Sequence, residues 1–350
     1  MNAQQTQPKI KKETKNKIRV EFDRTSRWTR FRIKYLSLSF LGQLVFKLFR
    51  LVLLLGISYV ILFPFFSKIS SSFMSPEDFV DVTVKMIPKN PTLNTYKQII
   101  RENDYFQALL NTTVLSLLCA FAQTFICCII GYGFGKYRFK GAGLLFGCVM
   151  LTMIVPHRIL SLSLFTEFRY FDIIKIFGDF KNPTGIIQLI TGDSIKLTGT
   201  YWPLAILSLT GLAFKNGLYI YMLRQFFRGV PDELEESAYI DGSGVFRTFV
   251  QIILPLSVPM MITVFLFAFS WQWTDNFYTS LLIPGTSGIT LMPDIIEIPK
   301  TLDTTYAGGS MFTAAIRNTG GLLVIAPLII IYLFCQRYLI QGIERSGITG

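Results

Sequence analysis

Six apolar stretches without a charged residue constrain this chain more than any other feature. They are 51–67, 105–135, 141–156, 197–214, 248–274 and 318–336. About 20 predominantly apolar residues cross a ~30 Å hydrocarbon core, with a lower limit near 17. We therefore expect six membrane-spanning helices, at about 49–70, 107–133, 143–165, 201–223, 256–280 and 319–338. The fourth is the least regular, because Lys215 lies within it.

The composition agrees with a protein that crosses a membrane several times. Apolar and aromatic residues make up 51% of the chain, and charged residues only 16% against a usual quarter. These values exclude a disordered chain, a disulfide-rich secreted domain and a coiled coil. The single histidine, His157, argues against a histidine-based metal site or catalytic centre. The sequence thus predicts an all-α membrane protein without a metal site.

The positive charge is concentrated in an N-terminal arm, residues 1–48. Residues 1–50 hold 13 Lys/Arg and 3 Asp/Glu. Such an arm binds nucleic acid or lies at a membrane surface. The apolar run that follows favours a cytoplasmic membrane flank, part of which could form an interfacial amphipathic helix. We expect a multi-pass protein of the cell membrane with both termini cytoplasmic, lipid contacts and no nucleic-acid partner.

The connections between the expected spans are unequal. On this topology the external loops are 71–106, 166–200 and 281–318, each of about 35 residues. They serve either as a docking surface for an external partner or as spacers. The internal loop 228–256 carries the densest charge of the second half of the chain.

That internal loop has the pattern of a short helix, a turn and a second helix. Pro231 can begin a helix, and Asp232 with Glu235 has the spacing of a capping box. Gly242 and the residues after it break the helix. Five acidic residues fall within ten positions: Asp232, Glu233, Glu235, Glu236 and Asp241. They indicate either a basic partner or a solvated turn.

The same loop resembles the EAA loop of binding-protein-dependent ABC importer permeases. That family's pattern is Glu-Ala-Ala, three residues, Gly, nine residues, Ile, one residue and Leu-Pro. The matching residues here are Glu236-Ser237-Ala238, Gly242, Ile252 and Leu254-Pro255. Every spacing agrees, and Ser237 is the one departure. The resemblance implies a type I ABC importer permease fold, with six transmembrane helices and a cytoplasmic coupling helix.

Other stretches resemble the carbohydrate-importer branch of this family. These stretches are Asn94-Thr95-Tyr96, Asn111-Thr112, the segment from Trp271 to Phe277, and Gln336-Arg337-Tyr338 with the glycines after it. The resemblance covers about 49–350, which we take as the permease domain. The insertion around 167–200 and the chain's ending resemble a sub-branch for oligosaccharides from complex polysaccharides.

The resemblance implies functional residues as well as a fold. The implied ATPase-coupling residues are Asp232, Glu233, Glu235, Glu236, Ser237, Ala238, Asp241, Gly242 and Pro255. The candidate substrate path comprises Trp271, Gln272, Trp273, Asp275 and Asn276, which could equally be an interfacial aromatic belt. The candidate tip for docking a binding protein comprises Tyr306, Gly308, Gly309 and Met311.

The implied partners supply what this chain lacks. It has no phosphate-binding loop, because no glycine stands five positions before Gly135-Lys136. We therefore expect no catalytic residue and no cofactor here, with ATP and Mg on a separate ATPase. The expected bacterial complex holds a second permease, two ATPase subunits and an extracellular substrate-binding protein.

Three alternatives compete with a sugar-importer permease. A permease for a non-sugar solute is disfavoured by the Gln336-Arg337-Tyr338 ending. A secondary transporter or channel would leave the 236–255 motif unexplained. A membrane-embedded enzyme would need a nucleophile and base, and none is recognisable.

Overall fold

A computed structural model describes residues 38–173, 177–179, 182–306 and 308–347. Residues 1–37, most of the predicted basic arm, lie outside this description. The chain separates into two compact units, 1–67 and 68–350. The described part of the first unit consists of α3 (Leu38–Ser72), which continues into the second. At 35 residues, α3 exceeds the length that a ~30 Å hydrocarbon core requires.

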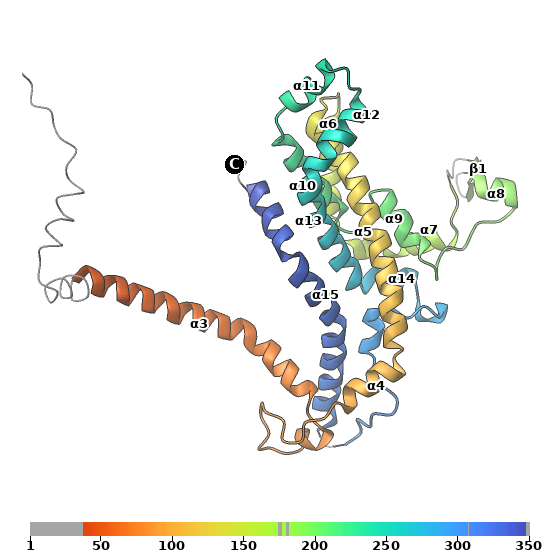
Figure 1. Cartoon of the computed structure of the whole chain (residues 1–350). Helices are drawn as coiled ribbons and strands as arrows, with labels where there is room; N and C mark the ends of the chain where they lie inside the picture. The colour runs from red at the N-terminus through yellow and green to blue at the C-terminus, as the bar shows by residue number, and fades with distance from the viewer. Residues whose placement is uncertain (1–37, 174–176, 180–181, 307, 348–350) are drawn as a thin grey trace, which may run out of the picture. The chain divides into compact units, whose positions relative to one another are not determined.

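The second unit is mostly helical. Its longer α-helices are α4 (Asn94–Glu102), α5 (Tyr105–Lys136), α6 (Ala142–Ile154), α7 (Ser161–Arg169), α9 (Trp202–Leu209), α10 (Asn216–Arg228), α11 (Glu233–Ile240), α13 (Leu254–Trp273) and α15 (Gly309–Gly347). The shorter ones are α8 (Ile186–Thr191), α12 (Val245–Thr248) and α14 (Phe277–Leu282). Figure 1 shows α11 and α12 at one end of the group formed by α5, α10 and α13, and α4 at the other end.

Five short helical turns of other types complete the second unit. The 3₁₀ turns are η1 (Pro76–Phe79), η2 (His157–Leu160), η4 (Gly285–Ser287) and η5 (Met292–Ile296). The fifth, η3 (Phe249–Ile253), is a π turn between α12 and α13. Pro255 lies two residues after this turn and supplies no backbone N–H, so regular helical bonding is interrupted there.

The core forms around α5, which packs against α9, α10 and α13. Two glycines one turn apart allow α10 to approach closely. A Cβ atom at Gly131 would lie 2.8 Å from Leu223 Cβ, and one at Gly135 would lie 2.9 Å from Phe227 Cβ. Small residues at this spacing are typical of helix contacts in membranes, because they let two backbones pack closely.

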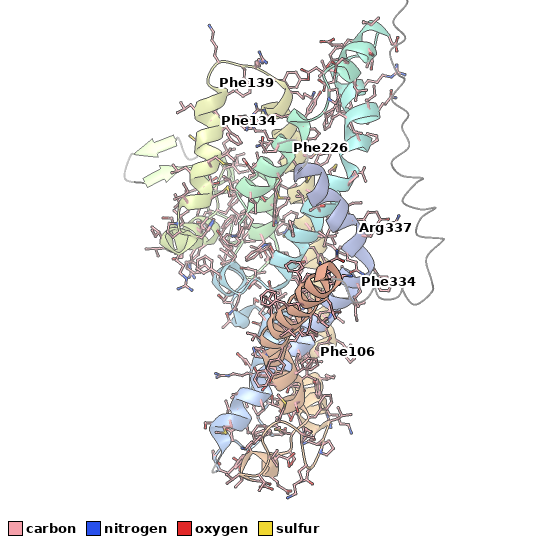
Figure 2. All side chains as sticks on the ribbon, turned by 90° about the vertical axis from the view of Figure 1, so that its left-hand side faces the viewer. Phe106, Phe134, Phe139, Phe226, Phe334 and Arg337 are labelled. Carbon is pink, nitrogen blue, oxygen red and sulfur yellow. The ribbon has the colours of Figure 1, made fainter. Side chains whose placement is uncertain are left out.

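Aromatic side chains pack densely at the end of α5 near α11. Phe134, Phe139 and Phe226 lie toward this end, whereas Phe106 lies toward the other (Figure 2). The rings of Phe134 and Phe139 are 5.9 Å apart between centroids, and Tyr132 lies 5.4 Å from Phe227. This cluster makes a rigid base under the loop 228–256.

Among the residues that the structure describes, four helical segments are long and apolar enough to span a membrane. They are Gly42–Ser72, Tyr105–Lys136, Val245–Trp273 and Gly309–Leu339. A fifth span is possible if Ala142–Ile154 and His157–Arg169, bent by 92° at Pro156, are counted together. The protein is therefore a multi-pass membrane protein.

The fourth predicted span, 201–223, is not one continuous helix. It is divided into α9 and α10 by residues 210–215. Gly211 and Lys215 both have left-handed backbones, with φ of 76° and 71°, and this conformation ends a right-handed helix. The prediction of one helix over 201–223 is wrong, because residues with left-handed backbones cannot continue the right-handed helix between α9 and α10.

The described residues are mostly helical, as predicted, and the insertion after α7 adds one short pair of strands. Strands β1 (Phe177–Asp179) and β2 (Asn182–Thr184) pair antiparallel there, with Gly178 opposite Pro183. The buried Asp172 carboxylate accepts N–H bonds from four residues: Ile173, Gly185, Ile187 and Gln188. Phe171 and Ile195 form a backbone bridge that brings the two ends of the insertion together.

Candidate functional site

In the folded chain, the start of helix α11 lies against the C-terminal end of helix α5. The buried Lys136 ammonium lies 2.5 Å from the Asp232 carboxylate and donates to the Val230 carbonyl at 2.6 Å. This ammonium lowers the pKa of Asp232 below its ordinary value. The predicted capping box is wrong, since the Asp232 side chain makes no cap hydrogen bond within α11. Its carboxylate turns to Lys136 instead.

A second contact fixes the inner face of α11. Glu235 is 8% exposed, and the Tyr132 hydroxyl donates to its Oε1 at 2.8 Å. Ala238, one turn further on, is also buried. The Tyr132 ring lies 4.7 Å from the Phe249 ring of the π turn, between centroids. The sequence does not reveal this inward position of Glu235, because its partner is about 100 residues away.

The outer face of α11 is both acidic and apolar. Glu233, Glu236, Ser237 and Ile240 are exposed on this face, and Asp241, which directly follows the helix, is exposed as well. Ile240 is 86% exposed, and Phe246 on α12 is 79% exposed. Gly242 turns the chain with φ of 81°, and a Cβ there would meet nothing within 4 Å. Helix α11 therefore presents charge and apolar area to the same side.

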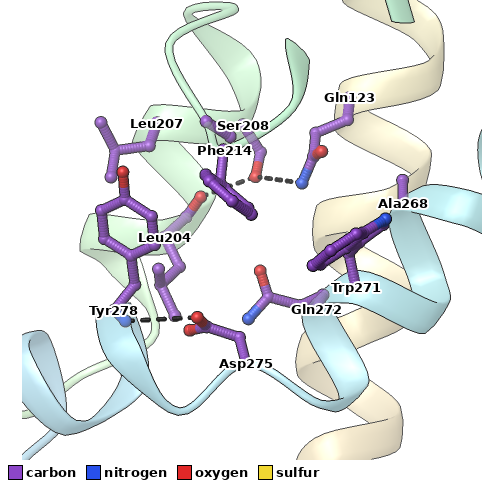
Figure 3. Close-up of a pocket in the computed structure, with 11 residues that line it drawn as sticks. Gln123, Leu204, Leu207, Ser208, Phe214, Ala268, Trp271, Gln272, Asp275 and Tyr278 are labelled. Carbon is purple, nitrogen blue, oxygen red and sulfur yellow. Dashed lines mark hydrogen bonds between the residues drawn. The ribbon is translucent and has the colours of Figure 1, made fainter. Parts of the chain in front are cut away.

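A polar pocket lies between α5, α9, α13 and α14 (Figure 3). Its cavity volume is about 20 Å³. The Gln123 amide donates to Ser208 Oγ at 3.3 Å, and Ser208 donates to the Leu204 carbonyl at 2.7 Å. The Gln272 Nε2 atom is buried without a hydrogen-bond partner. The pocket thus offers amide and hydroxyl groups inside an apolar wall.

The predicted substrate-path residues separate into two groups. Trp271, Gln272 and Asp275 line the pocket. Trp273 is 1% exposed and donates from Nε1 to the Val324 carbonyl of α15 at 2.9 Å. Asn276 is exposed and does not line the pocket. Helical geometry separates Trp271 from Trp273, because two residues along a helix differ by about 200° in direction.

The Asp275 side chain is hydrogen-bonded to the backbone of the helix that follows it. Its carboxylate accepts N–H bonds from Phe277, Tyr278 and Thr279 at 3.2, 3.3 and 2.9 Å. It therefore satisfies the first turn of α14. Next to it, Tyr278 Oη lies 2.6 Å from His157 Nδ1.

Sequence reasoning missed Gln123, Ser208 and the Tyr278–His157 pair. Single polar residues inside apolar helices were the available signal for Gln123 and Ser208. Such residues in membrane helices usually face the interior of the protein or a water-filled cavity.

The predicted docking tip is partly a packing element. Gly308 has φ of 91°, and a Cβ there would lie 3.0 Å from the Phe79 carbonyl oxygen. Gly309 begins α15, and the Tyr306 ring lies 6.1 Å from the Phe312 ring. Met311, by contrast, is 65% exposed. Gly308 and Tyr306 thus hold the loop in place, and Met311 offers side-chain surface.

Long apolar helices with a pocket containing polar groups between them are the architecture expected of a membrane transport protein. The family described as binding-protein-dependent transport system inner membrane component matches residues 128–345. This chain belongs to that family.

Curated relatives include several oligosaccharide permeases. The chain is 27% identical to the arabinooligosaccharides permease AraQ of Bacillus subtilis, over 87% of this chain and 98% of AraQ. It is 25% identical to the galactooligosaccharides permease GanQ of the same species, over 87% and 95%. It is also 25% identical to the maltodextrin permease MalD of Streptococcus pneumoniae, over 85% and 93%.

The fold matches a solved ABC transporter. A chain of a bacterial importer of the acidic polysaccharide alginate superposes with a TM-score of 0.62 at 18% identity, covering 85% of this chain and 97% of that one. An alginate transporter in complex with a pentasaccharide-bound periplasmic protein gives a TM-score of 0.56 at 15% identity, covering 89% and 98%. The fold is accordingly that of a type I ABC importer permease.

Proposed function

We propose that this chain is one of two permease subunits in an ATP-driven, binding-protein-dependent importer of oligosaccharides. Membership of the family and the oligosaccharide permeases among the relatives support the class and the substrate. The second permease, two ATPase subunits and an external binding protein complete the complex. ATP and Mg belong to the ATPase.

In this proposal the chain crosses the membrane six times. Four spans are the long helical segments, and α6 with α7 and α9 with α10 are two broken spans. Broken helices are tolerated inside a membrane where the freed backbone groups line a cavity or are buried in protein. Both termini and the loop 228–256 lie on the cytoplasmic side.

The observation that carries the proposal is the two-sided character of α11. Its inner face is joined to α5 through Lys136 and Tyr132, while Glu233, Glu236 and Ile240 are exposed. We infer that α11 is the coupling helix and that its outer face binds the ATPase. Movement of the ATPase would then pass to α5 through these two side-chain contacts.

The pocket lined by Trp271 and Gln272 is the proposed substrate path. Amide and hydroxyl groups bind sugar hydroxyls, and an aromatic face packs on a sugar ring. Gln123, Ser208 and Gln272 supply the first kind of group and Trp271 the second. Met311 remains the candidate contact for the external binding protein.

The experiment is co-purification of the tagged chain in mild detergent, followed by an uptake assay in vesicles. The wild-type chain should bring down an ATPase and a second permease. Glu236→Lys and Gly242→Leu should leave membrane insertion intact but reduce uptake at least tenfold, since α11 no longer seats in the ATPase. Glu77→Lys, the same charge change on the exposed η1 turn, is the control and should retain the ATPase. Wild-type uptake by both loop variants would contradict the proposal.

A further inference from the structure

Two broken helices face one pocket. The chain bends after α6 at Pro156, and the segment 210–215 separates α9 from α10. Residues 152–157 and 211–215, with Leu218, line a single pocket with a cavity volume of about 220 Å³. Irregular backbone within a membrane protein lies against protein or a water-filled cavity, because lipid cannot satisfy its polar groups. The two breaks therefore bring freed backbone polar groups to the wall of one pocket.

Lys215 brings a positive charge to this pocket. It directly precedes α10 and has a left-handed backbone with φ of 71°. Its ammonium lies 4.4 Å from the centre of the Phe214 ring and 4.6 Å from the centre of the Trp271 ring. Aromatic faces attract a cation but do not cancel its charge.

No carboxylate neutralises this ammonium within the part of the chain that the structure describes. The ion pairs found there join Lys89 to Asp81 and Lys136 to Asp232. Asp275, the acid of the neighbouring pocket, is occupied by three backbone N–H groups of α14. The start of α10 adds partial positive charge of the same sign. The net charge around the Lys215 ammonium is therefore positive.

Lys215 also stands beside the proposed substrate path. Phe214 and Ala213 line both the pocket of Lys215 and the pocket of Gln123, Ser208 and Gln272. The two pockets therefore share a wall, and Lys215 lies beside the polar groups of the second. The Gln272 Nε2 atom, buried without a partner, offers a further donor there.

We propose that Lys215 binds the carboxylate of an acidic sugar in transit, so that the importer carries oligosaccharides containing uronic acid residues. This inference rests on the proposed function and adds the charge of the substrate to it. Phe214 and Trp271 hold the ammonium in position, and the sugar carboxylate supplies the counter-ion that the chain lacks. An ion bound in this way leaves again easily, because the site is open to water and holds one cation.

The test uses the intact importer complex in nanodiscs of uncharged phosphatidylcholine, without the binding protein. Calorimetric titration compares trigalacturonate with the neutral galactose trimer. The wild-type complex should bind the acidic trimer about tenfold more tightly, since hydrogen bonds to charged groups exceed those between neutral groups. Lys215→Gln should remove this preference, and Lys215→Arg should keep it.

Arg158→Gln is the matched control. Arg158 is exposed, does not line the pocket and carries the same charge, so its loss should leave the preference unchanged. Equal binding of the two trimers by the wild type, or an unaltered preference in Lys215→Gln, would overturn the inference. Loss of trigalacturonate binding on exchange to anionic phosphatidylglycerol would also overturn it, since Lys215 would then hold a lipid headgroup.

Failure of this inference differs from failure of the proposed function. A complex that retains its ATPase and imports neutral oligosaccharides without a charge preference would refute the role of Lys215 alone. A chain that purifies without an ATPase would refute the importer.

Discussion

The two side chains of the Lys136–Asp232 ion pair differ strongly in their exposure to solvent. The Lys136 side chain is 5% exposed and that of Asp232 is 80% exposed. A buried ammonium needs hydrogen-bond acceptors, because transfer from water costs several kcal/mol when it is left unpaired. The Val230 carbonyl and Asp232 are both such acceptors. The hydrogen bonds of Lys136 therefore attach the residues that precede α11 to the end of α5.

This pair has a predictable dependence on pH. Lys136 lowers the pKa of Asp232 from 3.8, so the carboxylate is ionised in the folded protein at neutral pH. A carboxyl with a lowered folded pKa contributes stability above its unfolded pKa, and that stability is lost as the pH falls through the folded value. We expect the attachment of α11 to be constant from pH 8 to about pH 5 and to weaken only below 3.8.

Asp232→Asn should reproduce the weakened state at pH 7. Hydrogen exchange of the backbone amides in 233–240 should then be faster than in the wild type, by severalfold. Asp241→Asn, which changes another exposed acid, directly after the end of α11, should leave these rates unchanged. Unaltered exchange in Asp232→Asn would show that Tyr132 and Glu235 hold α11 by themselves.

Among the elements, the long helices were predictable and the breaks were not. Apolar runs without charge require membrane burial, so α5, α13 and α15 follow from the sequence. A break depends on local backbone geometry. Gly211 and Pro156 were visible, but glycine and proline also occur within continuous membrane helices, as Pro327 does in α15.

The site was predictable to the extent that it is local. The short helix predicted before Gly242 is present as α11, and Trp271 and Gln272 of the predicted path line one pocket, while the roles given to these residues stay predictions. The opposite direction of Trp273, and the inward position of Glu235, depend on partners on other helices, Val324 and Tyr132. Spacing along one helix indicates which residues share a face, but it does not indicate which face meets the pocket.

The close contact of α5 with α10 gives a prediction at this scale. Gly131→Ala should lower the free energy of unfolding by about 1–3 kcal/mol, because its Cβ would lie 2.8 Å from Leu223 Cβ. Gly133→Ala, on the same helix with nothing within 4 Å, should be neutral or slightly stabilising. Thermal unfolding of the purified complex measures both. Equal melting temperatures would mean that α10 moves aside without cost.

For the whole molecule, the charge of the arm determines the expected orientation. Lys and Arg near the first span favour the cytoplasmic side, and residues 1–50 hold 13 of them. With the six spans proposed above, the C-terminus would lie on the same side.

Protease accessibility in intact cells tests this topology. Sites inserted at either terminus, or after Gly242, should be protected, and sites inserted in 71–106 or 281–318 should be cut. Opening the cells should expose the protected sites. Cleavage after Gly242 from outside would reverse the topology and leave α11 unable to meet a cytoplasmic ATPase.

The insertion after α7 has a consequence for how such importers diversify. Both of its ends meet at Asp172 and at the bridge between Phe171 and Ile195. The positions of the helices on either side therefore depend on this closed junction. They do not depend on how many residues lie between its two ends. Doubling a flexible loop costs only about 0.6 kcal/mol in closure entropy. This segment can consequently lengthen, shorten or be exchanged between transporters while the helical framework stays as it is.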